Sequence, residues 1–116
     1  MTPFGDRLRR MRAERRLSLK QMAAGIGVSS AYLSALEHGR RGTPTFQLVQ
    51  RIIQYFNVIW DEAEELQRLA ELSAPRVVVD TAGLSPKATE LANRLSERIG
   101  ELDEAAIEDL LGRLKR

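Results

Sequence analysis

The sequence contains no cysteine, which excludes disulfide bonds, thiolate zinc sites and cysteine nucleophiles. One histidine and no ligands at metal-binding spacing leave it without a predicted metal or cofactor. No stretch approaches the roughly 20 apolar residues of a membrane-spanning helix, and no apolar segment with a cleavage site marks a secretory signal. We therefore expect a cytoplasmic protein that is not an enzyme, uses no cofactor and does not contact a membrane.

Charge is distributed unevenly along the 116 residues, although the net charge is only +2. Residues 1–57 contain ten Lys/Arg and three Asp/Glu, whereas residues 58–116 contain eight Lys/Arg and thirteen Asp/Glu. The first half is therefore strongly basic and the second half is acidic. A basic half indicates a polyanionic partner. This asymmetry is a first argument for double-stranded DNA, and hence for a protein associated with the nucleoid.

Two short helices joined by a glycine turn are predicted within residues 18–38. Ser18, with Gln21 three residues later, has the pattern of a capping box that opens the first of these helices. Gly27 can adopt the left-handed conformation that ends it, and Ser29 is expected to cap the second helix. The segment therefore predicts a helix-turn-helix motif.

Three further helices are expected to complete a five-helix N-terminal domain at residues 1–73. One precedes the motif, because Thr2 and Pro3 are typical of a helix start, and it is expected to run to about Arg15. A fourth helix follows the motif, and a fifth, acidic helix is expected at about 61–72. The fourth helix has helical spacing of its inward-facing apolar residues, which are Phe46, Val49, Ile52, Ile53 and Phe56.

The pattern changes after residue 73. Residues 74–84 predict a linker or a short strand that contains the β-like run RVVVD, and a lone strand would need a partner for its backbone groups. Residues 85–116 predict a helical hairpin, which we expect to form a dimer interface; capping of the domain's own core is the alternative. The predicted fold class is all-α. The apolar seam of the hairpin comprises Leu91, Leu95, Ile99, Ile107, Leu110, Leu111 and Leu114.

Four short motifs occur within residues 4–60: L-R-x-M-R from Leu8, S-x-x-Q-M-A from Ser18, G-V-S from Gly27 and L-S-x-L-E-x-G from Leu33. With these motifs the segment resembles the lambda-repressor-like, Xre-type helix-turn-helix family of bacterial and phage regulators. It covers about half of the chain, and the C-terminal half matches no family. The resemblance implies a DNA-binding transcription regulator that inserts its third helix, at about 30–38, into the major groove.

The resemblance also assigns the positions that face the bases. These positions lie opposite Leu33 and Leu36 on the third helix, at Ser30, Ala31, Ser34 and Ala35. All four side chains are small, and none is the Arg, Gln or Asn that makes bidentate contacts with a base. We therefore expect weak direct readout, with specificity that depends on DNA shape, half-site spacing and water.

Contacts with DNA phosphates are expected from residues around the motif, at helix N-termini and in the loop after the third helix. They are Ser18, Lys20, Ser29, Tyr32, His38, Arg40, Arg41, Thr43 and Thr45. Two roles stay open for Tyr32: contact with a phosphate or packing on the second helix. Two also stay open for His38, which is either a neutral hydrogen-bond donor to phosphate or an exposed residue without a role. Leu19 stands where the family often has Gln, so one phosphate anchor is missing.

Glu37 is the only acidic residue between Glu14 and Asp61, and it lies on the helix expected to approach phosphate. An unpaired carboxylate at this position would repel DNA. The family pairs this glutamate with an arginine of the first helix, which corresponds to Arg12 here. The resemblance therefore implies a structural ion pair between Arg12 and Glu37.

Two functions besides a dimeric repressor stay open on the sequence. One is an antitoxin whose C-terminal half masks a toxin while the N-terminal half binds its own operator. The other is a low-specificity nucleoid-type DNA-binding protein, which the small third-helix face would suit. We prefer the repressor, because a DNA-binding homodimer can act by occlusion. No stretch is long enough for a separate effector-binding domain, so a protein partner is the expected source of any regulation.

Overall fold

The structure is a computed structural model that describes residues 1–40 and 43–115. Over these residues the chain is helical, with no strand, and the predicted all-α class is confirmed. The chain divides into two compact units, Met1–Val77 and Val78–Arg116. No helix in the described part of the chain combines the length and apolar character that crossing a membrane requires.

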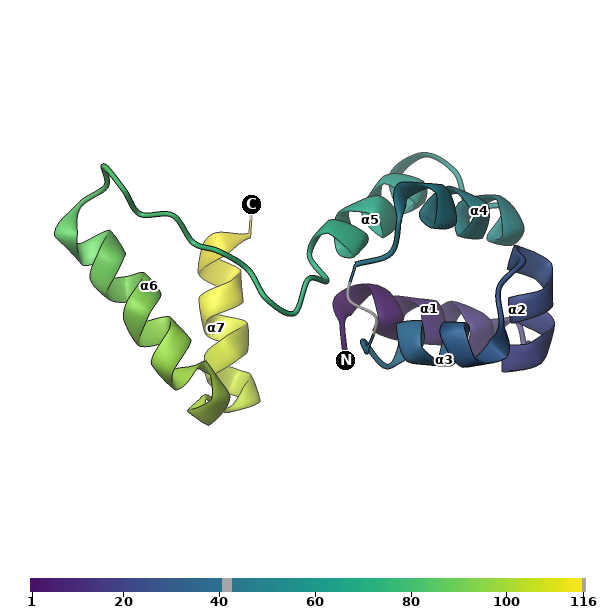
Figure 1. Ribbon diagram of the computed structural model, residues 1–116, viewed down its shortest axis with the longest axis horizontal. Coiled ribbons are helices and arrows are strands. Elements are labelled where there is room, and N and C mark those ends of the chain that lie inside the picture. Colours follow the sequence, from purple (N-terminus) through teal and green to yellow (C-terminus); the bar gives the residue numbers. More distant parts are fainter. Residues whose placement is uncertain (41–42, 116) are drawn as a thin grey trace. The chain divides into compact units, whose positions relative to one another are not determined.

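Five helices make up the N-terminal unit (Figure 1). A polar residue precedes each of the first four helices, and its side chain accepts a hydrogen bond from the backbone N–H three residues later. This N–H group has no hydrogen-bond partner within its own helix. The predicted capping box of Ser18 and Gln21 is present, and Gly27 ends its helix at a φ of 77°. These predictions are confirmed. The helices are α1 (Pro3–Glu14), α2 (Leu19–Ile26), α3 (Ser30–Glu37), α4 (Phe46–Phe56) and α5 (Trp60–Glu71).

A single apolar core lies between these helices. The helix α1 packs on α3 and α5, while α2 packs on α3 and α4, and α4 packs on α5. Side chains from all five helices enter the core, among them Leu8, Met22, Leu33, Ile52 and Leu66. The prediction that Phe46 faces inward is wrong. This side chain is 64% exposed, because it lies in the first turn of α4 and lines a surface pocket.

Two local features fix how α1 meets its neighbours. A Cβ atom added at Gly5 would lie 2.5 Å from the carbonyl oxygen of Glu37, so only glycine allows α1 and α3 to approach this closely. Ser73, which follows α5, is buried; its Oγ accepts a hydrogen bond from the Phe4 N–H at 3.0 Å and donates one to the Leu69 carbonyl at 2.6 Å. The N-terminus of α1 is therefore tied to the end of α5.

The C-terminal unit contains α6 (Pro86–Arg98), the short 3₁₀ helix η1 (Ile99–Glu101) and α7 (Glu104–Leu114). None of the described residues in these elements is buried. The valine run before them forms no strand, and Val78 is 95% exposed. Within this single chain the segment is therefore extended, without a partner strand among the described residues.

Candidate nucleic-acid interface

The helix α3 presents a narrow outward face. Leu33 and Leu36 are buried against the core and hold the opposite side of the helix. Ser30 and Ala31 are exposed, whereas Ser34 and Ala35 are half-buried. The four predicted base-facing residues therefore lie on the side of α3 away from Leu33, and their side chains leave little bulk between the helix backbone and an approaching molecule.

A buried ion pair joins α1 to the end of α3. The Nε atom of Arg12 donates to Oε2 of Glu37 at 2.8 Å, and Nη2 donates to Oε1 at 3.0 Å. The third guanidinium nitrogen, Nη1, donates to the Leu17 carbonyl at 3.1 Å, so the arginine also holds the turn before α2. The side chain of Glu37 is 1% exposed and that of Arg12 is 24% exposed.

This pair changes the electrostatics of the site. The hydrogen bond to Glu37 is the main cause that raises the pKa of Arg12 above its usual value, and burial opposes it only in part. Arg12 therefore stays charged and neutralises the carboxylate. Because Glu37 is buried within the unit, its negative charge does not stand on the outward face of α3.

Most of the predicted phosphate-facing residues are exposed. They are Ser18, Lys20, Ser29, His38, Arg40, Thr43 and Thr45. Tyr32 is half-buried and packs on the core, which favours the packing alternative for this residue. Arg41 lies outside the described residues. The hydroxyl groups of Ser18, Ser29 and Thr45 accept backbone hydrogen bonds at helix starts, and each keeps an O–H donor.

His38 makes a hydrogen bond within its own helix. Its Nδ1 lies 2.8 Å from the Ser34 carbonyl oxygen, which can only accept, so Nδ1 carries a proton and donates. In a neutral ring the other nitrogen, Nε2, is then an acceptor. A neutral His38 in this tautomer has no second N–H for a phosphate, so only the protonated ring fits the predicted donor role.

The cations of the N-terminal unit fall into two groups, a division that the sequence did not reveal. Some hold the fold: Arg15 donates to the Phe56 carbonyl at 2.8 Å and Arg51 to the Ile26 carbonyl at 3.1 Å. Both carbonyls lie at helix ends, where they have no partner within the helix. These contacts join residues at least 25 positions apart, so no local pattern predicts them.

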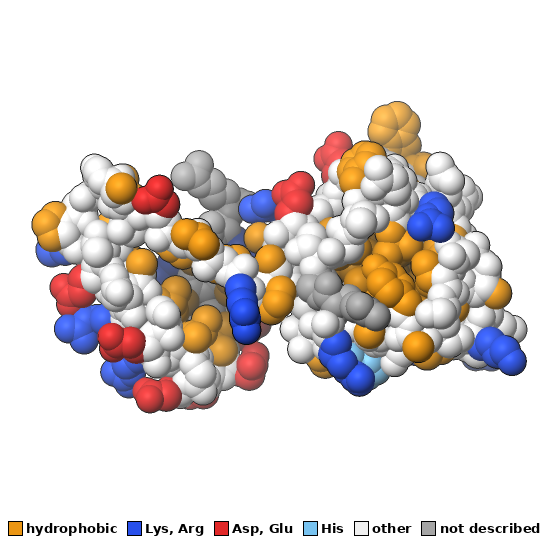
Figure 2. Space-filling view, in the orientation of Figure 1, with side chains coloured by type: hydrophobic (Ala, Val, Ile, Leu, Met, Phe, Trp, Pro, Cys, Tyr) orange, Lys and Arg blue, Asp and Glu red, His pale blue; other side chains and the backbone are white. Residues whose placement is uncertain are grey.

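The side chains of the second group make no hydrogen bond or ion pair with any part of the chain that the structure describes. Near the motif the group comprises Arg16, Lys20 and Arg40, and at the end of the unit Arg76 shares this property. Arg16 lies in the turn before α2, Lys20 lies in the first turn of α2, and Arg40 follows α3. Blue side chains stand at the lower edge of the N-terminal unit in Figure 2, where Figure 1 shows α3. Free positive charge thus precedes and follows the motif.

Comparison with known proteins gives three relatives, all from Bacillus subtilis. A model described as a helix-turn-helix domain matches residues 3–66. The uncharacterized HTH-type transcriptional regulator RghRB is 38% identical over 61 residues, or 53% of this chain and 44% of that protein. The HTH-type transcriptional repressor RghR is 32% identical over 79 residues, which cover 65% of this chain and 58% of that protein. The HTH-type transcriptional regulator SinR is 29% identical over 92 residues, which cover 72% of this chain and 83% of that protein.

The matched residues therefore span about half the length of RghRB and RghR. No solved structure matches the chain.

Replacing Glu37 with alanine is predicted to lower the free energy of unfolding by up to about 3–5 kcal/mol, because it leaves the partly buried Arg12 guanidinium without its carboxylate. Urea denaturation followed by circular dichroism measures this loss. Glu14→Ala is the matched control, since Glu14 is exposed, and its effect is expected to stay within about 0.5 kcal/mol. Equal stability of the two variants would show that the pair does not hold α3.

Proposed function

Because this chain belongs to the helix-turn-helix domain family, we propose that it is a DNA-binding transcription regulator whose helix α3 inserts into the major groove. The observation that carries this proposal is the outward face of α3. Its four small side chains stand opposite the buried Leu33 and Leu36, and free cations lie before and after the motif. The names of the three relatives, all transcriptional regulators or repressors, support the same function.

The chemistry of this face suits close approach more than strict base recognition. A serine hydroxyl can donate to or accept from several bases, and an alanine methyl can contact a thymine methyl. Neither side chain makes a bidentate hydrogen-bonded contact. We propose that Ser30, Ala31, Ser34 and Ala35 face the bases, and that DNA shape and half-site spacing supply most of the discrimination.

Affinity would then come from phosphate contacts. Lys20 and Arg40 are exposed and have no internal partner among the described residues, so their full charge is available to the DNA backbone. We add Arg16 to this group, because it lies in the turn before α2 with the same freedom. The first N–H groups of α2 and α3 are further donors for anions.

We further propose that the chain acts as a homodimer held by the C-terminal hairpin, and as a repressor by occlusion. Residues 1–73 would bind DNA, residues 74–84 would link, and residues 85–116 would dimerise. The hairpin carries a wholly apolar groove, and two of its leucines, Leu91 and Leu114, are 66% and 78% exposed. Water-exposed apolar seams of this kind mark interaction surfaces. The groove is lined by Leu95, Ile99, Leu102, Ile107, Leu110, Leu111 and Leu114.

A second copy is the occupant that the proposed function favours. Helix-turn-helix proteins typically bind as dimers on two half-sites about 34 Å apart, which multiplies weak contacts from each module. Leu102, in the turn between the two helices of the hairpin, lines the groove although the sequence pattern did not single it out.

The double substitution Ser34→Glu and Ala35→Glu is predicted to weaken DNA binding by about tenfold or more, because it places two carboxylates against the duplex. Electrophoretic mobility shift on a duplex selected from a random pool measures the affinity. Ser96→Glu with Ala105→Glu is the matched control, as it makes the same changes at exposed positions of the hairpin. If both variants bind equally well, α3 does not enter the groove.

The double substitution Leu95→Glu and Leu111→Glu is predicted to convert the dimer into a 13.1 kDa monomer, since charges in the apolar groove oppose its burial. Sedimentation equilibrium reports the mass directly. Ser96→Glu with Ala105→Glu again serves as the control and should stay dimeric. An unsubstituted chain that sediments as a monomer would contradict the proposed role of the hairpin.

A further inference from the structure

The helix α5 has an exposed face that neither the core nor the proposed DNA interface uses. Trp60, Glu64, Gln67 and Glu71 follow one another at intervals of four, three and four residues, so they form one line along the helix, here called the α5 stripe. The stripe rises about 16 Å from end to end. None of its residues belongs to the proposed DNA-facing set.

The stripe begins at an unusual residue. Trp60 is the only tryptophan of the chain, and it is 80% exposed. Its φ of 55° lies in the left-handed region, which is a strained conformation for a bulky side chain, and such strain concentrates at functional positions. The preceding Ile59 is also exposed and gives α5 no side-chain cap. Exposed tryptophan is among the residues that contribute most to binding when a partner covers it.

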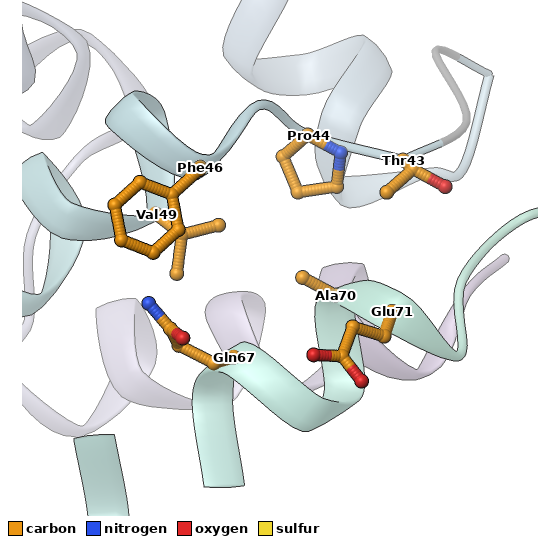
Figure 3. A pocket seen from close by; sticks show the side chains of 7 residues that line it. All are labelled: Thr43, Pro44, Phe46, Val49, Gln67, Ala70 and Glu71. Atoms are coloured by element: carbon orange, nitrogen blue, oxygen red, sulfur yellow. The ribbon is translucent and has the colours of Figure 1, made fainter. Parts of the chain in front are cut away.

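An apolar pocket lies beside the other end of the stripe (Figure 3). Pro44, Phe46 and Val49 line it from one side, and Ala70 lies across from them. Gln67 and Glu71 of the stripe, together with Thr43, complete the lining. The cavity measures about 130 Å³. Because an apolar cavity of about 150 Å³ can hold a benzene molecule, this pocket has room for one apolar side chain. Figure 2 shows hydrophobic side chains gathered on the viewed face of the N-terminal unit.

The first turns of α5 carry unpaired acidic charge. Asp61 and Glu64 are exposed and make no ion pair within the described chain, whereas Glu65 pairs with Arg7 and Glu71 with Arg68. An isologous contact between two copies would set these carboxylates against each other, which disfavours a second copy as the occupant. The same carboxylates would repel DNA. A positively charged protein surface is the complementary partner.

We propose that the α5 stripe and its pocket bind a basic amphipathic helix of a partner protein. One apolar side chain of that helix fills the pocket, lysine or arginine residues lie near Asp61 and Glu64, and Trp60 is covered at the far end of the stripe. The helix α5 packs on α1 and α4, whereas α3 packs on α1 and α2. The two surfaces share only Thr43, which lines the pocket and is also expected to face phosphate. The proposal does not depend on DNA binding, because its other residues lie outside the DNA-facing set.

The test titrates the full chain with a synthetic amphipathic Lys/Leu helical peptide that lacks aromatic residues, and with its Glu/Leu counterpart. Emission of Trp60 reports binding without a label, since no other tryptophan is present. The Lys/Leu peptide is expected to shift this emission saturably, and the Glu/Leu peptide is not. Failure of the Lys/Leu peptide to change the emission would overturn the proposal.

Variants then locate the bound peptide. Glu64→Lys and Phe46→Ser are each expected to weaken binding about tenfold. Glu62→Lys is the matched control: it makes the same change two residues away on the opposite side of α5, so less than about a twofold effect is expected. Equal weakening by Glu62→Lys and Glu64→Lys would show only diffuse attraction and overturn the proposal, as would unchanged binding in Phe46→Ser. Circular dichroism checks that each variant is folded, and an unchanged affinity of Glu64→Lys for DNA separates this surface from the α3 face.

Discussion

The ion pair between Arg12 and Glu37 is the interaction on which the presentation of α3 depends. A buried carboxylate is tolerated only when a cation compensates it, and the bidentate pair holds the end of α3 against α1. The close contact at Gly5 permits this approach of the two helices. Together they keep Leu33 and Leu36 in the core, so the small residues of α3 are the ones that face outward.

The positive charge of the N-terminal half serves two purposes, and this limits the number of cations left for DNA. Arg12, Arg15 and Arg51 hold helix ends and turns in place. Arg16, Lys20 and Arg40 have no such partner in the described residues. A module with few free cations and no bidentate base contact is expected to bind weakly by itself. The proposed dimer would raise the affinity for DNA, because two linked modules bind more tightly than either module alone.

Local features of the fold could be predicted from the sequence because their causes are local. Ser18 caps α2 through Gln21, three residues away, and Gly27 ends the helix through its own backbone freedom. Features that depend on distant residues could not be predicted. Ser73 accepts a hydrogen bond from the Phe4 N–H, and Phe46 lies outside the core in a pocket that residues of α5 also line. The strained, exposed position of Trp60 could not be predicted either, because the residues next to it in the sequence do not indicate it.

Directed cleavage of DNA tests the placement of α3 most directly. The chain has no cysteine, so Ser34→Cys supplies a single thiol for an iron–EDTA reagent, and Gln67→Cys supplies the same reagent on α5. The account predicts cuts from position 34 in two short clusters about one helical turn of DNA apart, on a duplex selected from a random pool, and no comparable cuts from position 67. Cleavage from position 34 that is no stronger or more localised than from position 67 would contradict it.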